Sequence, residues 1–395
     1  MTLREIADAI GIGEYQPFLD ELYENMTFTD APAVDLSLID SLQQEWNLFD
    51  DYYQLVRAIA VEVNNDEKRS VWVKLTAAHA LAHPLDLAKQ VPAPAFDGTV
   101  ITNMLPLYTM LPSIPVGIQT YLDHGFSHDE LNRLLMGYHG GMEIVHHRTG
   151  IPGVNKTYYN WLMTFAKARI YRTDALQFEL RQAPADATYL KNKTTGQVIP
   201  VISQGMVHRS GEQKLGSAGY EDEEGAFEAI FREDDQAYYG HGCFDNVIDT
   251  EEKAFPKTEW EIFLAPGGDC LSIHIPRGMD MSPAALDASL AEGLRMARER
   301  FPEHNSKAIY GSSWILDPSL IDMIGPQSKI AGLQARFVKY PQKSDGSAVF
   351  MFVFDGKPAN LEDLEETTTL HRKLKKLYLE GGFNHTYAGI IVSEG

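Results

Sequence analysis

The spacing of hydrophobic residues changes near Arg169, and no other feature restricts the fold of this chain as strongly. Upstream, apolar residues recur three and four positions apart, as in residues 36–63, which is typical of amphipathic helices. Downstream, Ala175–Leu180 alternates apolar and polar residues, which predicts a strand with one exposed face. A chain of 395 residues is long enough for two domains. We therefore predict a helical N-terminal domain, residues 1–168, followed by a domain of strands and helices, residues 169–395.

Capping signals and helical periodicity locate several helices in the first domain. Ser127 and Glu130 form a capping box, because each side chain can bond the backbone N–H of the other residue. This pair predicts a helix that runs through Met142. Further helices are predicted at residues 2–10, 36–63, 70–83 and 158–168.

The second domain has an informative order of elements from Trp260 onward. Trp260–Leu264 and Cys270–Ile275 are predicted to be strands that the turn sequence Ala265–Asp269 joins into a hairpin. Ser282 and Pro283 are a hydroxyl N-cap and a first-turn proline, and they predict a long helix ending near residue 301. Beyond it we predict strands at 307–310, 335–340, 348–354 and 387–392, and helices at 318–324 and 361–379.

Two successive strand–helix–strand crossovers in this order predict a mixed sheet with helices on its faces. In such sheets ligands bind at the carboxyl ends of parallel strands, beside helix N-termini. Here that position falls between His274 and the helix at Ser282. Arg277, Gly278 and Ser282 are therefore candidate phosphate-binding residues, through a guanidinium, close backbone approach and unpaired helix N–H groups. The alternative is a loop that merely connects two elements and leaves Arg277 in solvent.

Three segments resemble a bacterial family of acyltransferases with a helical N-terminal domain and a GNAT-like C-terminal domain. They are Trp314–Phe337 (WILDPSLIDMIGPQSKIAGLQARF), Arg172–Leu180, and His274–Gly278. The resemblance implies acyl-CoA or acetyl-CoA as co-substrate, with its pyrophosphate at the long helix and its pantetheine between two splayed strands. The chain departs from the GNAT phosphate loop, because Pro276–Met281 replaces the expected Arg/Gln-x-x-Gly-x-Gly/Ala pattern.

His274, Tyr310 and Glu261 are the candidate catalytic residues. An imidazole titrates in the range needed to take a proton from an ammonium, a tyrosine can protonate a departing thiolate, and a carboxylate can act as a base through water. Each has a structural alternative. His274 between two isoleucines is also typical of a packed core residue, Tyr310 of a packed ring with its hydroxyl exposed, and Glu261 of a solvent-facing carboxylate.

Other clusters of reactive residues carry less weight. His241 and Cys243 lie in a segment, 238–245, that we predict to be a loop, where they could serve a hydrolase or a metal. His139, Glu143 and His146 include one Glu-x-x-His step, but a carboxylate-bridged metal site needs a second step and further carboxylates. We therefore expect no metal.

The composition of the chain limits the classes of molecule that it is expected to bind. The net charge of −21 opposes binding to nucleic acid or to an anionic membrane. The two cysteines form no disulfide framework, and the absence of a signal core or a long apolar run predicts a cytoplasmic protein. We expect an acyl-CoA-dependent N-acyltransferase acting on a small-molecule or peptide amine, and leave a homodimer open. A non-catalytic ligand-binding or regulatory protein with the same fold is the alternative.

Overall fold

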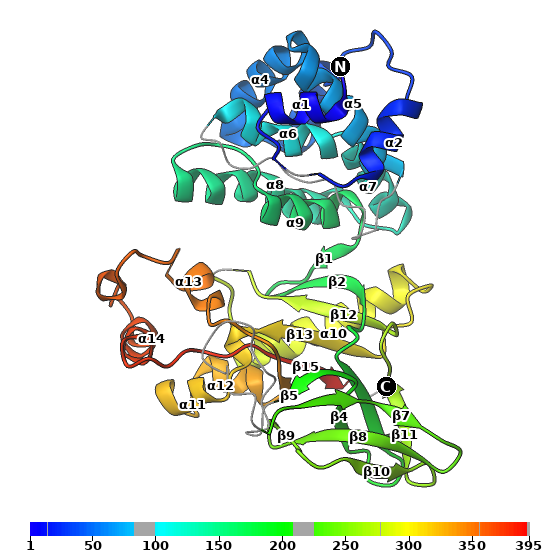
Figure 1. Ribbon diagram of the computed structural model, residues 1–395, viewed down its shortest axis with the longest axis vertical. Coiled ribbons are helices and arrows are strands. Elements are labelled where there is room, and N and C mark those ends of the chain that lie inside the picture. The colour runs from blue at the N-terminus through cyan, green and yellow to red at the C-terminus, as the bar shows by residue number, and fades with distance from the viewer. Residues whose placement is uncertain (14, 83–98, 208–224, 277, 355, 393–395) are drawn as a thin grey trace. The chain divides into compact units, whose positions relative to one another are not determined.

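The computed structural model describes residues 1–13, 15–82, 99–207, 225–276, 278–354 and 356–392 (Figure 1). The chain divides into two compact units, Met1–Tyr171 and Arg172–Gly395. The division falls inside strand β1 (Ile170–Arg172).

The described part of the first unit is helical. Its α-helices are α1 (Leu3–Ala9), α2 (Phe18–Asn25), α3 (Leu36–Trp46), α4 (Tyr53–Asn65), α5 (Glu67–Ala82), α6 (Val100–Met110), α7 (Ser113–Asp123), α8 (His128–Thr149) and α9 (Lys156–Ala166). The Ser127–Glu130 capping box begins α8 as predicted. That helix continues past Met142 until Gly150, which adopts a positive φ of 72°. The single helix predicted over 36–63 is wrong, because Asn47 takes a left-handed conformation and ends α3.

Buried aromatic residues hold the first unit together. Trp72, Tyr108 and Tyr138 are each at most 1% exposed. A buried hydroxyl must find a partner, and both tyrosines use carbonyls of other segments: Tyr108 donates to Val56 O at 2.7 Å and Tyr138 to Leu162 O at 3.2 Å. These bonds tie together helices that are distant in sequence.

The second unit contains two large sheets and flanking helices (Figure 1). Its α-helices are α10 (Pro283–Arg300), α11 (Ser319–Ile324), α12 (Lys329–Gln334), α13 (Ala348–Phe352) and α14 (Thr369–Leu379). After β1, its strands are β2 (Gln177–Gln182), β3 (Ala187–Asn192), β4 (Val198–Ile202), β5 (Gln204–Val207), β6 (Phe227–Ile230), β7 (Arg232–Glu233), β8 (Ala237–Phe244), β9 (Val247–Ile248), β10 (Lys253–Pro256), β11 (Trp260–Leu264), β12 (Asp269–His274), β13 (Ala308–Ser313), β14 (Val338–Pro341) and β15 (Tyr387–Val392).

The six-stranded sheet has the order β1-β2-β12-β13-β15-β14. Strands β12 and β13 are parallel neighbours, connected through α10, which confirms the first predicted crossover. The second predicted crossover does not produce neighbours, because β15 lies between β13 and β14 and is antiparallel to both. The fold is thus a helical unit followed by a mixed-sheet α/β unit, as predicted.

The other large sheet contains β10-β8-β4-β3-β11, with β7 and β9 beside β8. The predicted hairpin of Trp260–Leu264 with Cys270–Ile275 is therefore wrong, because β11 pairs with β3 while β12 pairs with β2 and β13. The turn between them connects two sheets. The loop predicted at 238–245 is also wrong, because it forms most of the central strand β8.

The two sheets pack face to face. Their shared core joins Cys270, Tyr310 and Ile390 of the first sheet to Tyr189 and Ile202 of the second. Helix α10 covers the opposite face of the six-stranded sheet, where a methyl group added at Gly293 would lie 2.4 Å from the Phe178 ring.

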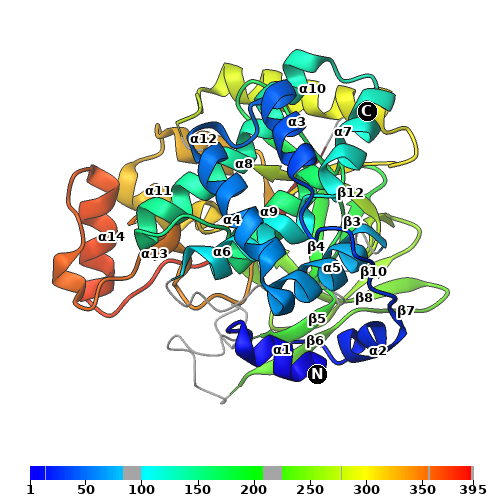
Figure 2. The ribbon, with the colours of Figure 1, turned by 90° about the horizontal axis from the view of Figure 1, so that it is seen from above.

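Helices α11, α13 and α14 form a smaller group at the side of the second unit (Figure 2). Leu320, Val349 and Leu374 are its buried centre. The strand predicted at 348–354 is wrong, because Val349 and Phe350 are buried on a short helix. A short apolar run does not by itself distinguish a strand from a buried helical turn.

Candidate active site

Strands β12 and β13 stop pairing before they reach their carboxyl ends. They pair only at Leu271↔Ile309 and Ser272↔Tyr310. Beyond these pairs each strand continues along its outer neighbour, β12 to His274↔Gln177 on β2 and β13 to Ser313↔Tyr387 on β15. The β12–β13 ladder therefore ends before the strands do, and we call this unpaired end, which carries polar side chains from both strands, the opening.

Gly311 lies on β13 just past the last paired residue. A Cβ atom there would lie 2.9 Å from the Phe337 ring and 3.1 Å from Ile273 Cγ2. Both approaches are closer than ordinary contacts, so only glycine allows Phe337 and Ile273 to pack against the strand at this point. Phe337, the last residue of the segment Trp314–Phe337, thus packs against the sheet beside the opening.

His274 is the last residue of β12 and lies at the opening. Its Nε2 is 3.1 Å from Glu179 Oε2 on β2, and the two side chains are 32% and 21% exposed. The register explains the contact, because Glu179 is opposite Ser272 and shares its face with His274. When the neutral ring donates from Nε2, the Nδ1 lone pair is its basic site. A carboxylate in this position orients the imidazole.

Tyr310 is on the same face as Ser272, directly beside it in the parallel pair. It is only 3% exposed, and burial, with a further contribution from the Asp186 carboxylate, raises the pKa of its hydroxyl to about 12. An ordinary thiol has a pKa of about 8.5, so a thiolate leaving group would take this proton unfavourably. The hydroxyl is better suited to donate a hydrogen bond than to transfer its proton.

Ser312 and Gln342 form the other side of the opening. Ser312 Oγ donates to Gln342 Oε1 at 2.5 Å, and Gln342 Nε2 donates to Asp186 Oδ2 at 2.6 Å. Gln342 Nε2 also lies 3.5 Å from the Tyr310 hydroxyl oxygen. Glu179, Gln342 and Asp186 were not among the predicted site residues. The alternation along Ala175–Leu180 placed Glu179 on an exposed face, but only the strand register brings it to His274.

Glu261 lies elsewhere. It is an exposed residue of β11, opposite Lys191 of β3. His274 and Tyr310 belong to the six-stranded sheet, whereas Glu261 belongs to the edge of the other sheet. The structure does not place Glu261 among the residues at the opening.

The N-terminus of α10 already holds a carboxylate. Asp280 accepts hydrogen bonds from Ser282 N at 2.9 Å and from Ser282 Oγ at 2.8 Å, and these bonds, with Lys329, lower the pKa of Asp280. Lys329 Nζ lies 3.3 Å from Asp280 Oδ1. Ser282 caps the helix as predicted, and Gly278 adopts a positive φ of 80°. Arg277, the third predicted phosphate-binding residue, lies outside the described residues.

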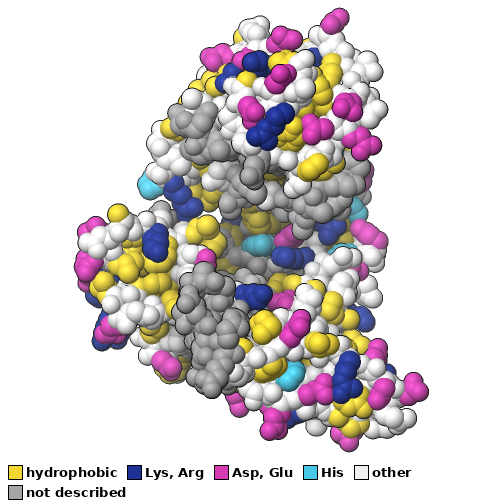
Figure 3. Space-filling view, in the orientation of Figure 1, with side chains coloured by type: hydrophobic (Ala, Val, Ile, Leu, Met, Phe, Trp, Pro, Cys, Tyr) yellow, Lys and Arg dark blue, Asp and Glu magenta, His cyan; other side chains and the backbone are white. Residues whose placement is uncertain are grey.

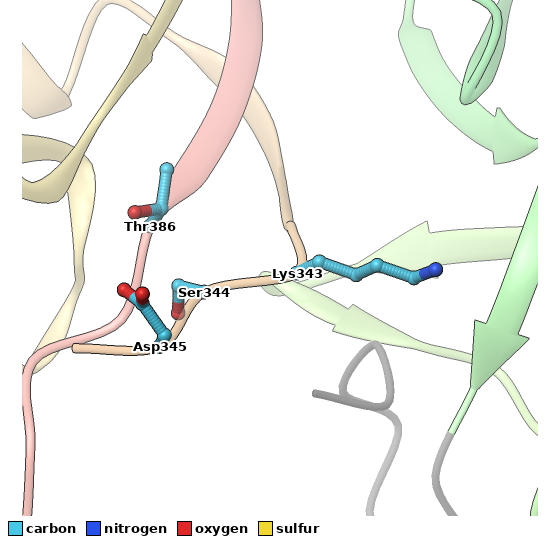
Figure 4. A pocket seen from close by; sticks show the side chains of 4 residues that line it. All are labelled: Lys343, Ser344, Asp345 and Thr386. Carbon is cyan, nitrogen blue, oxygen red and sulfur yellow. The ribbon is translucent and has the colours of Figure 1, made fainter. Parts of the chain in front are cut away.

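A pocket of about 270 Å³ lies beside β15, lined by Lys343, Ser344, Asp345 and Thr386 (Figure 4). It is at the same edge of the six-stranded sheet as the opening, because Gln342 N donates to Thr386 O at 2.9 Å just before β15 begins. No sequence pattern distinguished these residues.

The cysteines are not available as nucleophiles. Cys243 and Cys270 are buried, and this burial raises the pKa of each thiol to about 12. The thiolate is the reactive form of cysteine, so the hydrolase hypothesis loses its nucleophile. Among the described residues, no three or more His, Cys, Asp or Glu side chains gather as a metal site requires.

The surface carries the acidic balance of the sequence. On the face shown in Figure 3, acidic side chains lie over both units, with Lys and Arg side chains among them. Within the part of the chain that the structure describes, no helix combines the length and hydropathy needed to cross a bilayer.

Comparisons with known proteins identify a family and a fold. Residues 170–391 match the family described as GNAT-like C-terminal domain. Among curated proteins, no significant relative was found. Solved structures with the same fold include a mutant acyltransferase in complex with octanoyl-CoA, with a TM-score of 0.67, 17% identity and 99% of each chain covered. Two structures of an acyltransferase, one with decanoyl-CoA and teicoplanin and one with decanoyl-CoA alone, have a TM-score of 0.65, 17% identity and 99% coverage of both chains.

Proposed function

Because the chain belongs to the family defined by the GNAT-like C-terminal domain, we propose that it transfers an acyl group from acyl-CoA to an amine. The opening between β12 and β13 is the observation that carries this proposal. If β12 and β13 paired along their full length, their backbone N–H and C=O groups beyond Ser272 and Tyr310 would bond to each other. Because the ladder ends there, the amides of a pantetheine chain can bond to these groups instead. The similar structures contain octanoyl-CoA and decanoyl-CoA, so medium-chain acyl-CoAs are the first co-substrates to test.

In the proposed reaction, the amine nitrogen attacks the thioester carbonyl carbon. The new C–N bond forms, the C–S bond breaks, and CoA leaves as its thiolate. We propose that His274 takes the proton of the attacking amine on Nδ1. The contact between His274 Nε2 and Glu179 supports this role, because the carboxylate would stabilise the imidazolium. Tyr310 and Ser312 supply hydroxyl groups on the other strand. Holding the two reactants together supplies the remaining rate enhancement.

The CoA phosphates are proposed to bind at the N-terminus of α10, where Ser282 and Gly278 lie. Asp280 competes for that position, and Lys329 is paired with it. Asp280→Asn should therefore tighten acyl-CoA binding several-fold, and Lys329→Gln should weaken it. Isothermal titration with decanoyl-CoA measures both. Weaker binding to the Asn variant would show that the phosphates bind elsewhere.

The deciding experiment combines binding with turnover. Purified protein should bind decanoyl-CoA and release CoA in the presence of an amine acceptor, as followed with a thiol reagent. General acid–base catalysis typically contributes about 10²–10⁴-fold, so His274→Gln should lower kcat within that range and leave the Kd for acyl-CoA unchanged. Glu179→Gln should give a smaller loss. The proposal fails if no acyl-CoA binds or if His274→Gln has full activity.

A further inference from the structure

The pocket beside β15 is connected to the opening through one residue. Gln342 bonds Thr386 through its backbone N–H and Ser312 through its side chain, and Lys343, Ser344 and Asp345 follow it directly in sequence. A molecule in the pocket would therefore lie beside the residues that form one side of the opening. The residues of the proposed reaction leave this pocket without a role.

The lining of the pocket suits a cation. Asp345 Oδ1 accepts from Ser347 N at 2.9 Å and from Ser347 Oγ at 2.5 Å, and these bonds lower the pKa of Asp345, so that it is ionised at neutral pH. The Asp345 carboxylate and the Thr386 hydroxyl lie on the same side, whereas the Lys343 chain extends away from the other three residues (Figure 4). Ser344 Oγ is buried and makes no hydrogen bond within the described residues. An unused buried hydroxyl is uncommon and often marks a place where water or a ligand completes the bonding.

We infer that this pocket binds a second, positively charged amino group of the acceptor, which makes the acceptor a diamine or polyamine. The inference rests on the proposed amine acylation. An amine must be neutral to attack a thioester, whereas a carboxylate favours the charged form of an amine. Asp345 is therefore suited to an amino group that does not react, while the reacting one lies at His274. The net charge of −21 would also raise the local concentration of a polycation.

Direct binding tests the pocket without turnover. Putrescine and butylamine have the same carbon chain and differ in the second amino group. A partly exposed ion pair contributes up to about 1 kcal/mol, which is about five-fold in affinity. Calorimetric titration should give a Kd for putrescine about five-fold lower than for butylamine. Asp345→Asn should remove that preference, and Asp322→Asn, an exposed carboxylate on α11, should keep it.

Steady-state kinetics show whether Asp345 acts on binding of the acceptor or on the chemical step. In Asp345→Asn the KM for putrescine should rise about five-fold, with kcat and the KM for acyl-CoA unchanged. If Asp345→Asn does not fold, as judged by circular dichroism, Thr386→Val carries the test, because it keeps the backbone bond from Gln342 and should reduce the preference about two-fold. Equal binding of putrescine and butylamine, or an undiminished preference in the variants that fold, overturns the inference. Loss of decanoyl-CoA binding in the wild-type protein would instead contradict the proposed function, and the putrescine titration would remain interpretable.

Discussion

Replacing Gly293 with alanine should destabilise the second unit, although alanine is the better helix former. Gly293 lies within α10, and its added Cβ would be 2.4 Å from Phe178 Cε2 and 2.5 Å from Cζ. Phe178 is fully buried on β2, so its ring cannot swing into solvent. Overpacking a core in this way costs about 1–3 kcal/mol. Alanine recovers about 1 kcal/mol of helix propensity relative to glycine, which leaves a net loss of up to about 2 kcal/mol.

Gly332 on α12 is the matched control in the same unit. The nearest atom to its added Cβ is Arg336 Nη1 at 3.9 Å, an ordinary contact. Gly332→Ala should therefore gain about 0.5–1 kcal/mol from reduced backbone entropy. The two variants should differ by about 1–3 kcal/mol, and a unit of this size changes its Tm by roughly 2–4 °C for each kcal/mol. Calorimetric melting of both proteins measures this difference.

A double-mutant cycle tests whether the Phe178 ring causes the loss. Phe178→Leu removes ring atoms that the new methyl group would meet, so its own destabilisation should be smaller in the Gly293→Ala background. The coupling should be at least about 0.5 kcal/mol. If Gly293→Ala melts at or above the temperature of Gly332→Ala, the packing of α10 on β2 is not as described. That packing matters for the site, because Glu179 follows Phe178 on the same strand.

Two further predictions concern buried titratable groups. Burial lowers the pKa of Lys339 from 10.5 to about 8. Between these two pH values the unfolded chain binds more protons than the folded protein does. The free energy of unfolding should therefore rise as the pH increases from about 8 to 10.5, by up to about 3 kcal/mol. Urea unfolding at several pH values should show this rise in the wild-type protein and not in Lys339→Met, and equal pH profiles would contradict it. The thiols of Cys243 and Cys270 have pKa values near 12 in the folded protein. At pH 8 they should therefore react with a thiol reagent at least about 10³-fold more slowly in the folded protein than in denaturant. Rapid modification of the folded protein would refute their burial.

The sequence was sufficient to predict elements whose signals are local. The Ser127–Glu130 box begins α8, Ser282 caps α10, and the last strand has the predicted bounds, Tyr387–Val392. Each depends on side chains that act on their own backbone or on a strict alternation of residues. The failures are non-local. Nothing in the turn between β11 and β12 indicates that it connects two sheets, because turn residues specify the direction of the chain and not the partner of a strand.

The candidate site shows the same division. The place of His274 at the end of a strand that precedes a helix was predictable, because it depends on local sequence. Its contact with Glu179, 95 residues earlier in the chain, depends on the antiparallel register of β2 with β12. Gln342 likewise contacts Ser312 across β15, so this contact depends on the strand order β13-β15-β14 and not on local sequence. A residue that acts through its neighbour on another strand leaves no local pattern to detect.

The acidity of the chain affects the two proposed substrates in opposite ways. CoA is an anion, and two described cations near the start of α10 are already paired, Lys329 with Asp280 and Arg336 with Asp287. Exposed ion pairs of this kind contribute little to stability, so a CoA phosphate can replace the carboxylates as partner of these two cations. The net charge of −21, however, does not attract the anionic CoA at long range. A cationic acceptor experiences the reverse, because the same charge attracts it from a distance and Asp345 offers it a local contact. In the proposed reaction, CoA recognition would therefore rest on short-range contacts at the opening and at α10, whereas acceptor recognition would combine long-range attraction with one carboxylate.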